Sequence, residues 1–206
     1  MVNYEEMLLY VENTLKDNNA IKSHNPFHSF RNRFTHSKRV YQWCVRLHDD
    51  LEVDEEVLYT AAIFHDIGYS KSKEDHAKYG AMMFKEYAIK MGFDEDFTKK
   101  VYDVIYHHSE KRLLKDPNSS NELIILLEAD LLDEEGALGI VWDFMALGNM
   151  KDKDYYDAFS EFLKHSANIL NQDYMVTKKA KKIWDSKKEL VRVFMTELER
   201  DLFVEE

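Results

Sequence analysis

The sequence predicts an all-α protein that folds as a single domain. Apolar residues recur at three- and four-residue spacing over almost the whole chain, as in helices that bury one face. Glycine and proline are scarce, at 6 and 2 of 206 residues, and strand-like patterns are weak. A chain of this length forms one well-buried core, so a second independent domain is not expected.

Helices are expected at residues 3–16, 35–49, 54–68, 75–91, 95–109, 120–132, 136–148, 153–170 and 175–203. The apolar run at 124–127 could instead form a buried strand, but the polar residues around it favour a helix. The segment 17–34 contains Pro26 and several Asn and Asp residues, so it is expected to be irregular. Ser119 or Ser120 can cap the helix expected at 120–132.

The last expected helix is long and amphipathic. Its apolar residues follow helical spacing; they are Ile183, Leu190, Val191, Phe194 and Leu198. We interpret this helix as a packing element that closes the domain. The alternative, a dimerisation helix, is less favoured, and the oligomeric state stays open.

The composition disfavours several classes of protein. The formal net charge is −11, so the surface repels polyanions, and neither a general nucleic-acid-binding protein nor a nuclease is expected. The single cysteine, Cys44, cannot form an internal disulfide and fits a reducing compartment. The acidic N-terminus lacks a signal pattern, and no apolar run is long enough to span a bilayer. A cytoplasmic protein without a membrane partner is therefore expected.

Helical spacing predicts that four titratable side chains face the core or lie at its edge. They are His36, His65, Asp66 and Asp130, and they come from three different helices. The carboxylate of Asp130 lies on a leucine-rich face without a nearby lysine or arginine, which is costly unless a cation compensates it. One inward histidine is more often a hydrogen-bonded core residue than a ligand. Four such groups are better explained by one shared divalent cation.

The same spacing sorts the other histidines. His76 and His108 share apolar helix faces and are expected to point inward, whereas His107 shares its side with charged residues and is expected at the rim or outside. A second His-Asp pair, His48-Asp49, runs into a strongly acidic segment. Because no apolar run surrounds that pair, it is expected at the surface.

The order His36, His65-Asp66, Asp130 resembles the HD superfamily of metal-dependent phosphohydrolases, whose signature is H…HD…D on an all-helical fold. Four segments are similar to elements of that family: "FRNRFTHSKRV", "AAIFHDIG", "YHHSE" and "EADLLDEEGALGI". The resemblance implies an HD-domain helical bundle within a single helical domain over 1–206. Its HD core is expected at about 30–142, followed by C-terminal packing helices at about 150–203.

The resemblance also implies that a divalent metal ion binds to His36, His65, Asp66 and Asp130. Two imidazoles and two carboxylates, with water in the remaining positions, suit an octahedral ion such as Mn²⁺, Fe²⁺, Co²⁺, Ni²⁺ or Mg²⁺. One ion is expected. His76 and His108 are placed to hold a second ion, as in branches with extra inward histidines, or to contact the substrate.

The implied reaction is hydrolysis of a small phosphate ester or anhydride, most often of a nucleotide. We expect a metal-activated water to attack phosphorus, with Asp66 orienting that water or accepting its proton. Arg33 and Lys71, which flank the ligand residues in sequence, are expected to contact the phosphate. A small nucleotide is favoured over a cyclic dinucleotide, because the "GYP" element of the cyclic-dinucleotide branch does not follow "HHSE".

Two positions depart from the pattern of the branch. Glu128 stands where Asp is usual, and Trp142 where Arg is usual. Neither position binds the metal in the family, so these departures concern the substrate. Two other functions stay open: a regulatory module that binds metal and nucleotide without turnover, and a dinuclear iron oxygenase. Which nucleotide is used, and whether phosphate or pyrophosphate leaves, is open as well.

Overall fold

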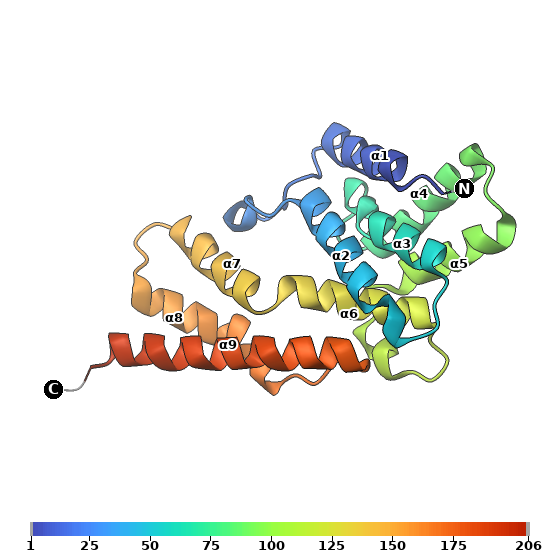
Figure 1. Ribbon diagram of the computed structural model, residues 1–206. Helices are drawn as coiled ribbons and strands as arrows, with labels where there is room; N and C mark the ends of the chain where they lie inside the picture. The colour runs from blue at the N-terminus through green and yellow to red at the C-terminus, as the bar shows by residue number, and fades with distance from the viewer. Residues whose placement is uncertain (1, 205–206) are drawn as a thin grey trace.

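Residues 2–204, which the computed structural model describes, fold into nine α-helices linked by short 3-10 helices (Figure 1). The α-helices are α1 (Tyr4–Asp17), α2 (Arg33–Leu47), α3 (Glu55–Phe64), α4 (His76–Met91), α5 (Glu95–His107), α6 (Asn121–Glu134), α7 (Ala137–Gly148), α8 (Tyr155–Lys164) and α9 (Lys178–Leu202). The 3-10 helices are η1 (Pro26–His28), η2 (His48–Asp50), η3 (Ile67–Ser70), η4 (Lys111–Lys115) and η5 (Ser166–Asn171). Over this range the pairing of extended backbone is limited to an isolated bridge between Lys22 and Asn32. The all-α prediction is confirmed, and the run at 124–127 is helical.

Polar side chains at the helix starts explain where most α-helices begin. Each of these residues accepts a hydrogen bond from a backbone N–H of the first turn; they are Asn3, Asn32, Asp54, Asp94, Ser120, Asp154 and Thr177. Such caps satisfy N–H groups that have no partner inside the helix. Ser120, one of the two residues predicted to cap α6, is the one that does so.

Helix α6 lies in the middle of the molecule. It contacts α2 and α3 on one side and α7 and α9 on the other. In Figure 1 the helices α1 to α5 lie to one side of α6, and α7 to α9 to the other. Side chains of α6 can therefore meet both halves of the chain.

Helix α9 packs against α6, α7, α8 and η5, as expected for a helix that closes the domain. Val191 is buried, and Ile183, Phe194 and Leu198 are partly buried against the core. The prediction for Leu190 was wrong, because this side chain is 45% exposed. Adjacent helical residues point about 100° apart, and Val191 takes the inward direction. None of the described helices is both long and apolar enough to cross a bilayer.

Two predicted helices are shorter in the structure. The helix expected at 54–68 ends at Phe64, and η3 then packs directly against α4. A Cβ at Gly68 would collide with the His76 carbonyl oxygen and the Gly80 nitrogen, so Gly68 permits this close approach rather than ending α3. The helix expected at 153–170 is divided into α8 and η5, because the backbone leaves the helical conformation at His165.

Candidate metal centre

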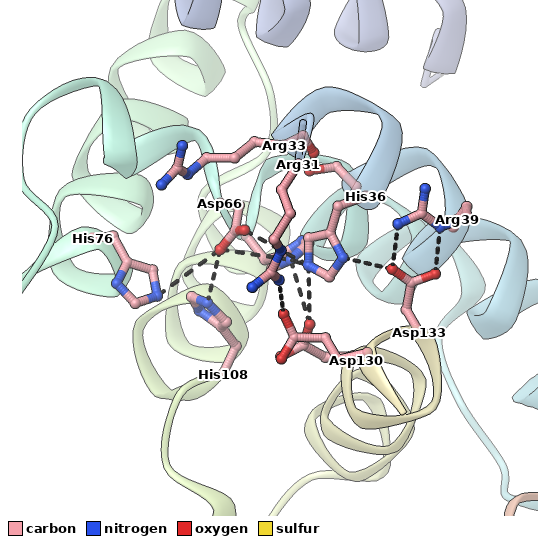
Figure 2. Close-up of polar contacts among 12 residues, drawn as sticks. Arg31, Arg33, His36, Arg39, Asp66, His76, His108, Asp130 and Asp133 are labelled. Atoms are coloured by element: carbon pink, nitrogen blue, oxygen red, sulfur yellow. Dashed lines mark hydrogen bonds and ion pairs between the residues drawn. The ribbon is translucent and has the colours of Figure 1, made fainter. Parts of the chain in front are cut away.

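The four predicted ligand residues meet where α2, α3 and α6 converge (Figure 2). His36 lies in the first turn of α2, and Asp130 lies in α6. His65 and Asp66 directly follow the last residue of α3. His36, His65 and Asp66 are buried, as their positions in the sequence predicted.

The ligand atoms of these residues face one another. His36 Nε2 lies 3.3 Å from His65 Nε2, 3.7 Å from Asp66 Oδ2 and 3.1 Å from Asp130 Oδ1. His65 Nε2 lies 3.7 Å from Asp66 Oδ1 and 4.0 Å from Asp130 Oδ1. Asp66 and Asp130 approach the His36 imidazole from different sides (Figure 2). The Asp130 carboxylate thus lies against the imidazole of His36 rather than against a lysine or arginine.

The tautomer of His65 is fixed by its surroundings. Its Nδ1 donates a hydrogen bond to the Ala62 carbonyl oxygen at 2.8 Å. Because a carbonyl oxygen only accepts, Nδ1 carries the proton, and Nε2 of the neutral ring directs a lone pair at the cluster. Burial lowers the pKa of His65 and keeps the ring neutral. This is the form of imidazole that binds a metal ion.

His36 is oriented by a carboxylate that sequence reasoning missed. Its Nδ1 lies 2.7 Å from Asp133 Oδ2. The buried Asp133 also accepts two hydrogen bonds from the guanidinium of Arg39, at 2.6 and 2.8 Å. The available signal was the spacing: Asp133 follows Asp130 by three residues and therefore shares its helix face.

The cluster holds positive charge between carboxylates. Burial lowers the pKa of His36, but its hydrogen bonds to Asp130 and Asp133 outweigh this and raise the pKa well above its usual value. Burial raises the pKa of Asp66, but the nearby His65, His108 and His36 outweigh it and hold that pKa well below its usual range. The Asp66 carboxyl is therefore ionised, and the site stabilises a cation.

The spacing of the donor atoms suits a divalent ion. Around an octahedral ion with bonds of about 2.1 Å, adjacent ligand atoms lie about 3.0 Å apart and opposite ones about 4.2 Å apart. The separations between imidazole nitrogens and carboxylate oxygens in this cluster run from 3.1 to 4.0 Å. Nitrogen and carboxylate oxygen together are typical ligands of the first-row divalent metals. One ligand atom each of His36, His65 and Asp66 lies within 4.8 Å of the others, so these three residues fit a divalent metal ion, and Asp130 contacts both imidazoles beside them.

The domain family was identified by comparison with models of known protein families. The model of the HD domain matches residues 33–135, half of the chain, and this range contains all four clustered residues. The chain belongs to the HD domain family. The resemblance inferred from the sequence motifs is confirmed. No curated protein matches the sequence significantly.

Solved structures share the HD-domain fold over nearly the whole chain. A predicted HD superfamily hydrolase from an uncultured Thermotogales bacterium is 22% identical, with a TM-score of 0.67, over 97% of this chain and 92% of that one. An HD-superfamily hydrolase from Bacillus thuringiensis is 18% identical, with a TM-score of 0.70, over 98% and 97%. YpgQ from Bacillus subtilis, in complex with ADP, is 18% identical, with a TM-score of 0.65, over 97% and 98%.

A second group of possible ligands adjoins the first in this HD domain. Asp66 Oδ1 lies 3.6 Å from His108 Nε2 and 3.9 Å from His76 Nε2. The Nδ1 atoms of these two histidines bond to the carbonyl oxygens of Ile105 and Lys73, so both Nε2 atoms face Asp66. Asp66 is therefore placed to bridge two ions, and binding of a second ion stays a prediction.

The two histidines predicted to lie at the rim or at the surface, His107 and His48, are found outside the cluster. His107 is partly exposed and bonds to Glu110 at 2.6 Å. His48 bonds to the Val45 carbonyl oxygen at 2.7 Å, and Asp49 forms an ion pair with Lys179 at the surface. Neither pair takes part in the cluster.

A cavity of about 610 Å³ opens beside the cluster and is lined by His36 and Asp66. Its lining contains the basic residues Arg31, Arg33, Arg39 and Lys73. The guanidinium of Arg31 is ion-paired with Glu134 and lies over the ring of Trp142, 3.9 Å from its centre. Arg39 is ion-paired with Asp133, whereas Arg33 and Lys73 form no ion pair among the described residues. In a protein of net charge −11, these two cations favour an anion in this cavity over one elsewhere on the surface.

The two predicted phosphate contacts differ in position. Arg33 lines the cavity; its Nη1 donates to the carbonyl oxygens of Ala20 and Lys22, and its guanidinium lies 4.0 Å from the centre of the Tyr69 ring. Lys71 is exposed and does not line the cavity, whereas Lys73 does. Contact of Arg33 or Lys71 with phosphate stays a prediction.

Proposed function

We propose that this HD-domain protein is a metal-dependent phosphohydrolase that acts on a small phosphate ester or anhydride, preferably a nucleotide. The observation that carries the proposal is the cluster of His36, His65 and Asp66, with Asp130 in contact, at the wall of a cavity rich in arginine and lysine. Such a cavity can hold an anionic group against a site for a divalent ion. The complex of YpgQ with ADP supports a nucleotide as ligand.

His36, His65, Asp66 and Asp130 would hold the ion. When bound, a divalent ion offsets charge on phosphoryl oxygens and lowers the pKa of a water molecule. Asp133 and the Ala62 carbonyl oxygen fix the two imidazole rings, so the donor atoms are oriented before an ion arrives.

Asp66 is assigned to orient the attacking water. Its two oxygens face different imidazoles, Oδ2 toward His36 and Oδ1 toward His65 and His108. An ionised carboxylate accepts a hydrogen bond from water and aligns it. The lowered pKa of Asp66 makes this carboxylate an orienting acceptor, rather than a group that keeps the proton of the water.

Basic side chains of the cavity are assigned to the phosphate. Arg33 is held rigidly by the Ala20 and Lys22 carbonyl oxygens through Nη1 alone, so Nε and Nη2 can donate to a phosphoryl oxygen. Lys73 is better placed than Lys71 to provide a second cation. These groups stabilise the negative charge on the phosphoryl oxygens and the charge that develops on the leaving group.

The test is release of phosphate or pyrophosphate from a panel of nucleoside triphosphates, diphosphates and monophosphates with Mn²⁺, Co²⁺ or Ni²⁺. We expect turnover by the protein, loss of it in Asp66→Ala, and full retention in Asp49→Ala, which alters the His-Asp pair outside the cluster. Absence of turnover above Asp66→Ala for every compound would refute the proposal. In that case nucleotide binding without product would favour the regulatory module, and oxygen consumption by the iron-loaded protein would favour the oxygenase.

A further inference from the structure

The cavity beside the metal centre continues into a second chamber of about 560 Å³. This far chamber lies between η1, α7 and η5. The two chambers share part of their lining, namely Asn25, His28, Arg31, Glu134 and Trp142. They therefore form one elongated space, with the metal centre at one end.

The two ends of this space differ in charge. The near chamber has four basic residues in its lining, which are Arg31, Arg33, Arg39 and Lys73. Arg31 and Arg39 are ion-paired with Glu134 and Asp133, whereas Arg33 and Lys73 form no ion pair among the described residues. The lining of the far chamber contains a single lysine or arginine among the described residues, Arg31. This side chain is already ion-paired with Glu134. The lining of the far chamber has the acidic residues Glu135, Asp143 and Glu161 in addition to the shared Glu134, and no lysine or arginine without an ion pair among the described residues. An anionic group is thus favoured near the metal and disfavoured at the far end.

Trp142 lies at the boundary between the chambers and offers a flat aromatic surface. The guanidinium of Arg31 occupies one position over its ring. Aromatic rings and guanidinium planes are the groups on which nucleobases stack. Trp142 is partly buried and lines both chambers, so its ring is available to a ligand that extends from one into the other.

Three polar atoms of residues that line the far chamber make no hydrogen bond among the described residues; one of them belongs to the shared residue His28. Gln172 Oε1 and His28 Nδ1 are buried without a partner. Both hydrogen bonds from Ser166 to Asp143 end on Oδ2, which leaves Oδ1 without one. An ionised carboxylate can only accept, so Asp143 Oδ1 is free to accept a hydrogen bond from an N–H donor of a ligand. Buried groups without a partner are costly, which favours a ligand that satisfies them.

We infer that the far chamber binds an uncharged nucleobase that carries an exocyclic amino group, and that the substrate therefore bears phosphate at one end only. The base stacks at Trp142, and its amino group donates to Asp143. A nucleotide with phosphate on both the 5′ and the 3′ oxygen would place its second anion beside Asp143 with no free arginine or lysine to receive it. This inference rests on the proposed function, which it narrows to a class of substrate.

The test compares four ligands: ATP, UTP, inorganic tripolyphosphate and ATP with an additional phosphate on the 3′ oxygen. Tripolyphosphate fills the near chamber alone, so its hydrolysis reports the metal centre without the base. We expect a KM for ATP at least about 10-fold below those for UTP and tripolyphosphate. The 3′-phosphorylated nucleotide should inhibit ATP hydrolysis with an inhibition constant at least about 10-fold above the KM for ATP.

Variants assign the effect to named residues. Trp142→Leu should raise the KM for ATP about 10-fold with little change in kcat and none in the KM for tripolyphosphate, and Trp142→Phe should restore most of the loss. Asp143→Lys should strengthen inhibition by the 3′-phosphorylated nucleotide. The matched control Asp185→Lys lies at an exposed position of α9, and it should leave the inhibition constant of the 3′-phosphorylated nucleotide unchanged. Thermal melting of each variant verifies that it folds.

The outcomes separate the two proposals. Hydrolysis of tripolyphosphate and ATP with equal KM, or equal loss for both in Trp142→Leu, would overturn the far-chamber assignment and leave the hydrolase in place. Absence of any hydrolysis would refute the proposed function. If no hydrolysis is found, the far-chamber assignment can still be tested by titrating the same ligands and recording the fluorescence of the protein. Quenching by ATP that is lost in Trp142→Leu supports the assignment, and quenching that persists in this variant overturns it.

Discussion

Asp133 illustrates how a residue outside the ligand set controls the centre. It contacts His36 and Arg39 but none of the other clustered groups. His36, His65 and Asp130 could be predicted, because a polar residue on an apolar helix face is visible in a single helical segment. The same spacing places Asp133 on the face of Asp130, but its role could not be predicted, because its partners lie in α2, 94 and 97 residues away along the chain.

Replacing Asp133 should weaken metal binding without removing a ligand. In Asp133→Ala the His36 ring loses its hydrogen-bond partner, and we expect an affinity for Mn²⁺ that is lower by about 10- to 100-fold. Titration of the metal-free protein, followed by calorimetry, measures this change. The control Asp103→Ala, on the exposed side of α5, should bind as the wild type does. Unchanged affinity in Asp133→Ala would show that His36 needs no orienting carboxylate.

Contacts between elements explain what the sequence pattern could not predict. Periodicity identified the α-helices, but it extended α3 through Gly68, because the approach of α4 to η3 depends on a neighbour distant in sequence. Gly68 and Gly80 lie back to back at this contact. The contact places His76 beside Asp66, so packing of two elements sets the geometry of the second ligand group.

Gly68→Ala should therefore be strongly destabilising. The added Cβ would collide with the backbone of α4, and we expect a loss of about 3 kcal/mol in the free energy of unfolding. Gly148→Ala is the matched control: its Cβ would meet nothing within 4 Å, so its stability should be equal or slightly higher. Urea denaturation of both variants compares them. Equal midpoints would contradict the close packing of η3 on α4.

The junction of α6 and α7 should make stability depend on pH. Burial, with a smaller effect of the neighbouring Glu134, raises the pKa of Glu135 to about 7 from its usual 4.5. The folded protein thus binds this proton more tightly than the unfolded chain, so the contribution of Glu135 to stability is present below pH 4.5 and is lost as pH rises through 7.

In Glu135→Gln the side chain cannot ionise, so the loss of stability that Glu135 causes as pH rises through 7 disappears. We expect its melting temperature to match that of the wild type at pH 5 and to exceed it at pH 8. The exposed Glu199→Gln variant of α9 serves as the control. A difference in melting temperature that is the same at both pH values would contradict the burial of the Glu135 carboxyl.

At the scale of the whole molecule, α6 joins the metal centre to the rest of the cavity. Its acidic residues Asp130, Asp133 and Glu134 each meet a basic group from residues 31–39. The sequence motifs predicted which residues form the candidate metal centre. The elongated cavity was not predictable, because its walls come from η1, α7 and η5, whose relative positions are set by tertiary packing rather than by local pattern.

The central claim is that residues from three helices converge to bind a divalent ion. It is tested most directly by the metal content of the purified protein, loaded with Mn²⁺ and measured by plasma mass spectrometry, beside Asp66→Ala and Asp49→Ala. We expect at least one ion per chain in the wild type and in Asp49→Ala, and a large loss in Asp66→Ala. Full metal content in Asp66→Ala would contradict it.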